Sequence, residues 1–146
     1  MEQALIDFLI RAKRATYAGN GAPSAPSRPA SHDLTYCEGK LCYIDTYIGT
    51  RCFAGEEALW RDGVPIWAMN YSGRVIGDGF SGDFLKECLL LVPPNMPFRG
   101  PPTHCSGGYK YRCEVQGSTD WFVGQETIAR DAVVVYECLF HGGHIL

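Results

Sequence analysis

Residues 43–75 read YIDTYIGTRCFAGEEALWRDGVPIWAMNYSGRV, and this stretch decides the fold. Aromatic, β-branched and other apolar residues form three short runs separated by turn residues, which predicts antiparallel strands over 43–48, 52–61 and 64–73. Asp62-Gly63 is the dipeptide that favours a type I′ two-residue turn, because both central positions need positive φ. Gly49-Thr50 is a weaker turn signal. The stretch therefore predicts a three-stranded meander.

The register of this meander follows if both turns contain two residues, so that Arg61 faces Val64 and Ile48 faces Arg51. Side chains then alternate between the two faces of the sheet. One face is mainly aliphatic and carries Ile44, Ile48, Phe53, Leu59, Ile66 and Ala68, with Glu57 and Asn70 as polar members. The other face carries Tyr43, Asp45, Tyr47, Glu56, Trp60, Trp67, Met69 and Tyr71. A longer turn at Gly49 would move the first strand's side chains to the opposite faces.

The second face combines aromatic rings with two carboxylates, which is unusual for a solvated face and for a core face. Aromatic rings around a carboxylate suit a flat or cationic organic ligand, through stacking and cation–π attraction. The eight residues of this face are therefore our candidate ligand-binding residues, with Glu56 or Asp45 recognising a cationic or hydrogen-bond-donating group. In the alternative interpretation, the same rings pack under a second layer of structure.

The flanking segments predict two helices and further strands. A three- and four-residue apolar repeat predicts an amphipathic helix over 2–18, which we expect to cover the aliphatic face. Ser81 is a suitable N-cap for a second helix over 82–92, and Pro93-Pro94 ends it. Four more strands are expected, with a hairpin turn at Asp131-Ala132; they span residues 34–37, 109–115, 121–130 and 133–140.

We therefore expect one α+β domain over residues 1–146: a single antiparallel sheet of six or seven strands with two helices packed on one face. Residues 19–33 and 93–108 are rich in Pro and Gly and are expected to be long loops. The 19–33 loop is either an exposed connector or a lid over a pocket.

Composition narrows the possible partners and the location. The 13 basic and 16 acidic residues give a net charge of −3 without a strong basic cluster, so we expect no direct binding of nucleic acid. No apolar run reaches the roughly 20 residues that span a bilayer. Glu2 and Asp7 interrupt any N-terminal signal core. The seven cysteines are odd in number and contain no C-x-x-C, so we expect reduced thiols in a cytoplasmic protein, although Cys37 and Cys42 could meet across a hairpin.

No motif assigns a catalytic residue, a metal site or a cofactor. Glu56 and Glu57 are adjacent on a strand, so they point to opposite faces and cannot form a converging acid/base pair. A buried Glu57 would need a partner, for which Arg74 and Arg99 are candidates. The His141–His144 spacing matches no standard zinc pattern.

Several sequence runs carry a resemblance to a known family. They are residues 17–21 (YAGNG), 43–47 (YIDTY), 53–57 (FAGEE), 65–71 (PIWAMNY), 80–85 (FSGDFL), 98–101 (FRGP) and 136–143 (YECLFHGG). With these runs the chain resembles a family of small uncharacterised bacterial domains, which are free-standing or follow a helix-turn-helix module. The resemblance implies a sensor of small molecules, and no catalytic role transfers with it. The present chain has no helix-turn-helix pattern, which implies a stand-alone module.

Three functions remain open, of which the first is favoured. It is non-enzymatic binding of a small organic molecule, in the manner of an effector-binding domain. The second is a small hydrolase or isomerase that uses Glu56 or Asp45 as general base. The third is a protein-interaction or homodimerisation domain that uses the aromatic sheet face.

Overall fold

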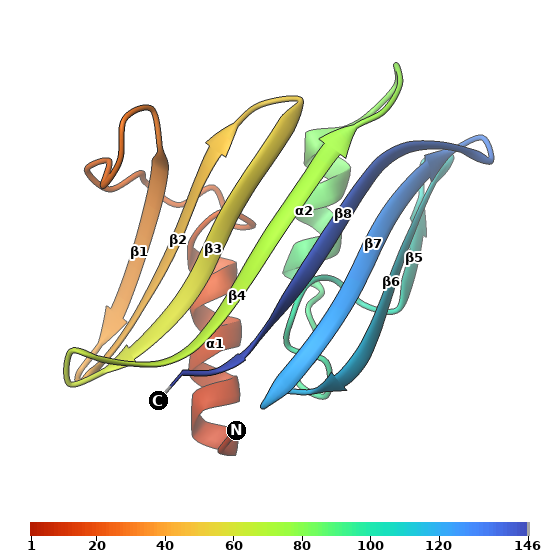
Figure 1. The fold of residues 1–146 in the computed structure, drawn as a ribbon. Helices are drawn as coiled ribbons and strands as arrows, with labels where there is room; N and C mark the ends of the chain where they lie inside the picture. Colours follow the sequence, from red (N-terminus) through yellow and green to blue (C-terminus); the bar gives the residue numbers. More distant parts are fainter. Residues whose placement is uncertain (146) are drawn as a thin grey trace.

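The computed structural model describes residues 1–145 and contains one eight-stranded antiparallel sheet with two helices (Figure 1). The strand order is β1-β2-β3-β4-β8-β7-β6-β5, so two four-stranded meanders meet where β4 pairs with β8. The strands are β1 (His32–Glu38), β2 (Leu41–Gly49), β3 (Cys52–Arg61), β4 (Val64–Val75), β5 (Thr103–Ser106), β6 (Tyr109–Ser118), β7 (Trp121–Arg130) and β8 (Val133–His144). The predicted α+β class is confirmed, and the strand missing from the prediction is β5, which lies inside the expected 93–108 loop.

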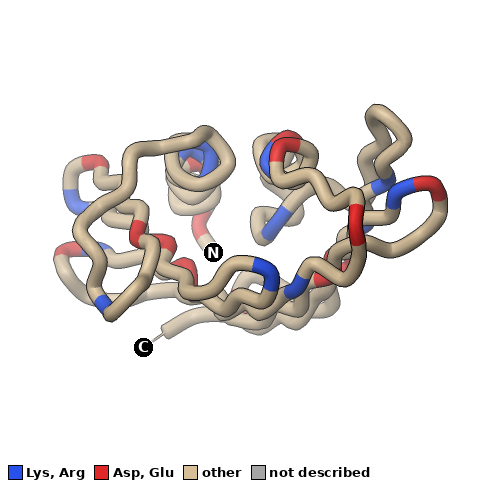
Figure 2. The backbone as a smooth tube through the Cα atoms, turned by 90° about the horizontal axis from the view of Figure 1, so that it is seen from above, with Lys and Arg blue, Asp and Glu red and all other residues tan. Residues whose placement is uncertain are grey.

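Both helices, α1 (Gln3–Ala15) and α2 (Gly82–Leu90), lie on the same face of the curved sheet (Figure 2). α2 begins as predicted, with the Ser81 hydroxyl accepting a hydrogen bond from the Phe84 amide at 3.2 Å. α1 ends earlier than predicted, because the backbone of Thr16 leaves the helical conformation. The amide of Gly21 donates to the Thr16 carbonyl at 2.8 Å and turns the chain away from the helix axis.

The turn between β3 and β4 is confirmed, but the pairing beyond it is shifted. Asp62 and Gly63 have φ values of 52° and 79°, as a type I′ turn requires. Trp60 faces Pro65 as predicted, whereas the next pair is Leu59 with Trp67, so β4 contains an extra residue at this point. Pro65 has no amide hydrogen to donate to the ladder, and a bulge is one of the few places where a strand accommodates proline.

The turn between β2 and β3 is longer than predicted. Ile48 faces Ala54 rather than Arg51, and Gly49, with φ of 95°, faces Phe53. Together, the two corrections move every side chain of β3 to the opposite face of the sheet relative to the predicted positions on β2 and β4. The predicted ligand face is therefore wrong in part: Glu56 and Trp60 lie on the opposite face from its other six members, and Glu57, Phe53 and Leu59 take their place.

The helices cover the aromatic face and not the aliphatic one, which corrects a second expectation. Tyr43, Trp67, Met69 and Tyr71 are buried under the helices, together with Phe8 and Leu9 of α1. Of the six aromatic-face residues on this side, four belong to the hydrophobic core, Tyr47 packs against it, and Asp45 is a buried polar residue. In residues 1–145, no second layer covers the opposite face of the sheet, which we call the open face.

Cys37 and Cys42 form a disulfide across the β1–β2 hairpin, where they face each other with 4.1 Å between Cα atoms. The expectation that every cysteine is reduced is therefore wrong for this pair. The other five cysteines are free in the structure. No helix in residues 1–145 is long and apolar enough to cross a membrane.

Candidate ligand-binding pocket

Five ionisable side chains are buried between the sheet and the helices. We call them the buried charge cluster, and they are Lys13, Asp45, Glu57, Arg99 and Glu126. They come from α1, β2, β3, the segment between α2 and β5, and β7. None of them is more than 7 % exposed, so each charge needs a partner that replaces water.

Four members of the cluster form two ion pairs. The Lys13 ammonium contacts the Glu57 carboxylate and also donates to the Phe98 carbonyl at 2.7 Å. The Arg99 guanidinium donates to Oε1 of Glu126 through Nε at 3.1 Å and Nη2 at 2.6 Å. Burial lowers the pKa of Lys13 despite the neighbouring Glu57. These pairs account for two positive and two negative charges.

Two tyrosine hydroxyls bind the Glu126 carboxylate, and a contact between Arg99 and Glu57 connects the two ion pairs. The hydroxyls of Tyr111 and Tyr136 both donate to the Glu126 carboxylate. Nη1 of Arg99 lies 3.7 Å from Oε1 of Glu57, which links the two ion pairs. The predicted partnership of Glu57 with Arg99 is therefore confirmed, whereas Arg74 pairs with Glu137 on the open face.

Asp45 is the cluster member without an ion pair in the described part of the chain. Its Oδ1 accepts a hydrogen bond from the Tyr71 hydroxyl at 2.6 Å, and its side chain is buried. Burial and then the negative charge of Glu57 raise the pKa of Asp45 to about 7. Asp45 therefore changes protonation state near neutral pH.

A cavity of about 350 Å³ opens beside Asp45, between the sheet and the segments that flank the helices. We call it the aromatic pocket. Asp45 and Arg99 provide its charged groups, and the other residues that line it include Tyr17, His32, Tyr47, Phe53, Tyr71, Phe80 and Tyr136. A much smaller void of about 20 Å³ also touches Tyr17, Asp45 and Arg99, and it extends towards Lys13 and Tyr43.

The rings of the pocket support one another. The ring of Tyr136 stacks with Phe80 at 5.2 Å and with Phe53 at 6.0 Å between centroids. Tyr47 stacks with His32 at 4.8 Å and meets Tyr17 edge-on at 5.9 Å. These contacts hold the aromatic surfaces in fixed positions, which is a property of preformed pockets.

A glycine keeps the ring of Tyr71 close to the sheet. A Cβ on Gly55 would lie 2.5 Å from the hydroxyl of Tyr71, so only glycine allows this ring to cross the neighbouring strand. The position of the ring brings its hydroxyl to Asp45. The glycine of β3 thus helps to define the floor of the pocket.

The 19–33 loop is tied to the sheet through Asp33. This carboxylate accepts hydrogen bonds from the Ser27 amide at 3.1 Å and from the hydroxyls of Ser31 and Thr46 at 2.7 and 2.8 Å. Burial favours a raised pKa, but these hydrogen bonds outweigh it and lower the pKa of Asp33 to about 2. The loop is thus a bonded connector rather than a free lid.

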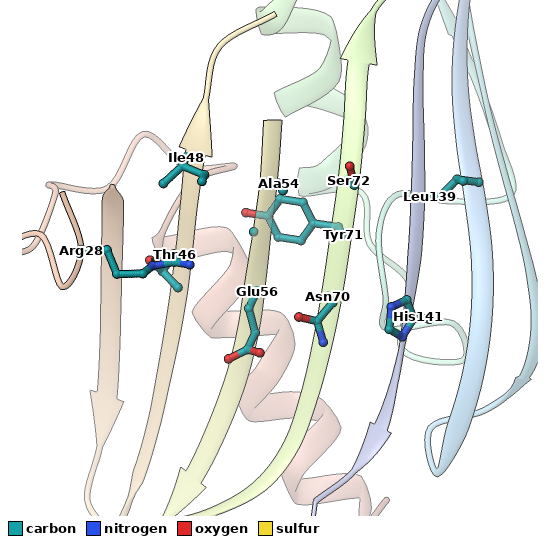
Figure 3. A pocket seen from close by; sticks show the side chains of 11 residues that line it. Arg28, Thr46, Ile48, Ala54, Glu56, Asn70, Tyr71, Ser72, Leu139 and His141 are labelled. Atoms are coloured by element: carbon teal, nitrogen blue, oxygen red, sulfur yellow. Dashed lines mark hydrogen bonds between the residues drawn. The ribbon is translucent and has the colours of Figure 1, made fainter. Parts of the chain in front are cut away.

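A second hollow, of about 600 Å³, lies on the open face of the sheet (Figure 3). Figure 3 shows Glu56 and Asn70 side by side on β3 and β4, with His141 of β8 on one side and Thr46 on the other. Arg28 reaches this surface from the 19–33 loop and donates to the Thr46 hydroxyl at 3.2 Å. This hollow is larger than the aromatic pocket, but it rests on one layer of structure. It has few aromatic walls and no buried charge, so we consider it the weaker candidate.

The predicted binding residues are divided among several places. Asp45, Tyr47 and Tyr71 line the aromatic pocket, and Tyr43 lines the adjoining void. Trp67 and Met69 lie in the core, where the Trp67 indole donates to the Thr119 carbonyl at 3.1 Å.

The two remaining candidates, Glu56 and Trp60, lie on the open face, as the corrected register requires. His144, which the sequence left unassigned, lies 3.3 Å from Asp120.

The prediction missed several residues of the aromatic pocket. Phe53 was assigned to the other face by the register error. Tyr17 follows α1, Phe80 precedes α2 and Tyr136 lies on β8, and no local sequence pattern connects these segments to Asp45. All four belong to sequence runs that were noted for their resemblance, but only the tertiary structure brings them together.

This fold and site define a small α+β domain in which one antiparallel sheet and two helices enclose a pocket with aromatic walls and a buried carboxyl group. The chain belongs to the DUF5680 family, a domain of unknown function whose model matches residues 45–145. The match begins at Asp45 and includes β3 to β8. Comparisons with curated proteins and with solved structures find no match.

Proposed function

We propose that this protein is a non-enzymatic domain that binds a small organic molecule in the aromatic pocket. The observation that carries the proposal is the preformed cavity of about 350 Å³ with aromatic walls and an unpaired acidic group. Binding sites for small molecules are typically concave, mostly apolar and equipped with a few polar groups that orient the ligand.

The biological role that fits this binding is sensing or sequestration of an effector. The resemblance to bacterial domains that are free-standing or follow a helix-turn-helix module supports such a role by analogy. Under this proposal the protein acts in the cytoplasm. Its partner is a small molecule and not nucleic acid.

A thermal-shift screen with a blocked pocket tests the proposal. The panel contains organic cations, neutral aromatic compounds and metabolite acids, applied to wild type and to Val75→Phe, which places a ring in the pocket wall. Val123→Phe makes the same change on β7, where the side chain is 53 % exposed, and serves as the control. Ligands that bind the native state raise the unfolding temperature, and the shift grows with the logarithm of their concentration above Kd.

We expect stabilising compounds to act on wild type and on Val123→Phe but not on Val75→Phe. Equal stabilisation of Val75→Phe would contradict binding in the aromatic pocket. A panel without any stabilising compound would favour the interaction function instead.

The pKa of Asp45 supports an enzymatic alternative. A carboxyl group that titrates near neutral pH is suited to act as general base in a hydrolase or isomerase. Glu56, the other candidate base, lies on the open face and does not reach the aromatic pocket. Chemical change of a bound compound, followed by NMR and abolished by Asp45→Asn, would favour this alternative.

A homodimer would need a different surface from the one expected. Six members of the aromatic face lie under the helices, whereas Ile48, Val123 and Leu139 are exposed at 42–63 % on the open face. Measurement of the solution mass of wild type and Leu139→Glu would detect a dimer that uses this face.

A further inference from the structure

We propose that the ligand of the aromatic pocket is an organic cation whose ammonium group lies beside Asp45, and that its binding releases the proton of Asp45. This inference rests on the proposed function. It adds the chemical class of the ligand and a coupling between ligand and proton.

The first argument is the charge balance of the buried charge cluster. Lys13 pairs with Glu57, and Arg99 pairs with Glu126, so these four side chains are neutral as a group. Ionised Asp45 adds one negative charge that no described residue pairs with. Burying a single uncompensated charge is strongly unfavourable, so the carboxyl group holds its proton until a positive charge arrives.

The second argument is that the surrounding groups cannot supply this positive charge. The groups that face Asp45 come from α1, the segment after it, β3, β4 and the segment before β5, and they are Lys13, Tyr17, Glu57, Tyr71 and Arg99. On its own strand, Tyr43 and Tyr47 flank it, and His32 lies against Tyr47. Lys13 and Arg99 are held by other carboxylates, and His32 is stacked on Tyr47 rather than paired with Asp45, so the cavity next to Asp45 remains available to a ligand.

The third argument is the chemistry of the walls. Aromatic faces carry a negative quadrupole and attract cations, most strongly where water is excluded. Tyr47, Phe53 and Tyr136 present such rings around the cavity. The guanidinium of Arg99 already lies over the Tyr71 ring, 5.2 Å from its centroid. An anionic ligand would instead meet the carboxyl group of Asp45, and the guanidinium of Arg99 in the pocket wall is already bound by Glu126.

The coupling to protons follows from this arrangement. A cation binds ionised Asp45 better than protonated Asp45, so below neutral pH the proton must leave before the complex forms. The apparent affinity is proportional to the fraction of the protein in which Asp45 is ionised. It therefore rises with pH until Asp45 is fully ionised. Between about pH 6 and pH 8 we expect an increase of about tenfold, because the ionised fraction grows by about that factor.

Three probes of similar size and different charge test the inference by calorimetry: phenethylammonium, phenethyl alcohol and phenylacetate. Wild type, Asp45→Asn and Glu56→Gln are titrated with each probe across this pH range, in two buffers of different ionisation enthalpy. We expect phenethylammonium to bind wild type at least about tenfold more tightly than the other probes at the upper pH. Its binding should release close to one proton at the lower pH.

The variants separate the role of Asp45 from a general effect of protein charge. Asp45→Asn should reduce the affinity for phenethylammonium to that for phenethyl alcohol and abolish proton release. Glu56→Gln removes a carboxylate from the open face and should retain the wild-type preference.

Equal binding of the alcohol or of phenylacetate would overturn the inference and leave the proposed function intact. Failure of all three probes to bind at millimolar concentration would overturn both.

Discussion

The pH dependence of stability should reveal the buried carboxyl group of Asp45. Its pKa in the folded protein is about 7, compared with 3.8 for an exposed aspartate. A raised pKa means that the folded protein binds the proton more tightly than the unfolded chain does. Asp45 therefore destabilises the folded state above about pH 7, where its charge must be buried. The free energy of unfolding falls because of this group as the pH rises from about 4 to about 7.

The size of the effect follows from the shift in pKa. A difference of about three pKa units corresponds to about 4 kcal/mol over the full range, at about 1.4 kcal/mol per unit. Part of this change occurs below pH 5, as the unfolded chain titrates. Between about pH 5 and pH 8, wild type should therefore lose about 2–3 kcal/mol that Asp45→Asn retains.

Urea unfolding at a series of pH values measures this difference directly. Asp45→Asn keeps a group that can accept the hydrogen bond from Tyr71, so the variant should fold at every pH in the series. Glu56→Gln controls for the loss of one carboxylate from the protein. The reasoning about buried charge is refuted if the difference in unfolding free energy between Asp45→Asn and wild type is the same at about pH 5 as at about pH 8.

Three further predictions concern the surroundings of the pocket. Gly55→Ala should destabilise the protein by about 1–3 kcal/mol in urea unfolding, because its Cβ would overlap a facing tyrosine ring, whereas Gly77→Ala, with nothing within 4 Å, should have little effect. Lys13→Met should cost about 3–5 kcal/mol, because it removes the ammonium that neutralises the buried Glu57 and leaves only the more distant, shared Arg99 beside it. Adding Glu57→Gln should recover much of the loss, and no recovery in this double-mutant cycle would contradict the pairing. Asp33→Asn should lower stability above about pH 4, because a carboxyl group with a lowered pKa stabilises the fold only while it is ionised. The difference from wild type should disappear as the pH falls towards about 2. Acid unfolding monitored by circular dichroism measures this difference, and a difference that stays constant with pH would contradict the prediction.

The sequence predicted the elements better than their pairing. Alternation and turn residues located seven strands and both helices, since these signals act within a few neighbouring residues. The register of β3 was wrong because a bulge beside Pro65 and a longer turn after Gly49 each change the pairing by an odd number of residues. No local pattern distinguishes a two-residue turn from a longer one at Gly49, but the outcome reverses every side chain of the strand.

The sequence predicted the kind of side chains in the pocket, aromatic rings around a carboxylate, but not all of the residues that form it. The association of tyrosines with Asp45 survives in the structure, although the helices cover this face and turn it into a pocket wall. Glu56 was exchanged for Glu57 by the reversal of β3. Arg99 was expected only as a possible partner of Glu57, and neither its place nor that of Tyr136 in the pocket could be predicted, because both depend on the arrangement of the second meander.

The meeting of β4 and β8 has a consequence for the order of folding. Asp45 and Tyr71 belong to the first meander, whereas Arg99 and Tyr136 come from later segments that join it through β8. Local hairpins form readily, but the β4–β8 seam links residues more than sixty positions apart, so its formation must overcome a large loop-closure entropy. The aromatic pocket is therefore expected to form late in folding, and a chain still being synthesised completes this pocket only when β8 has emerged and paired.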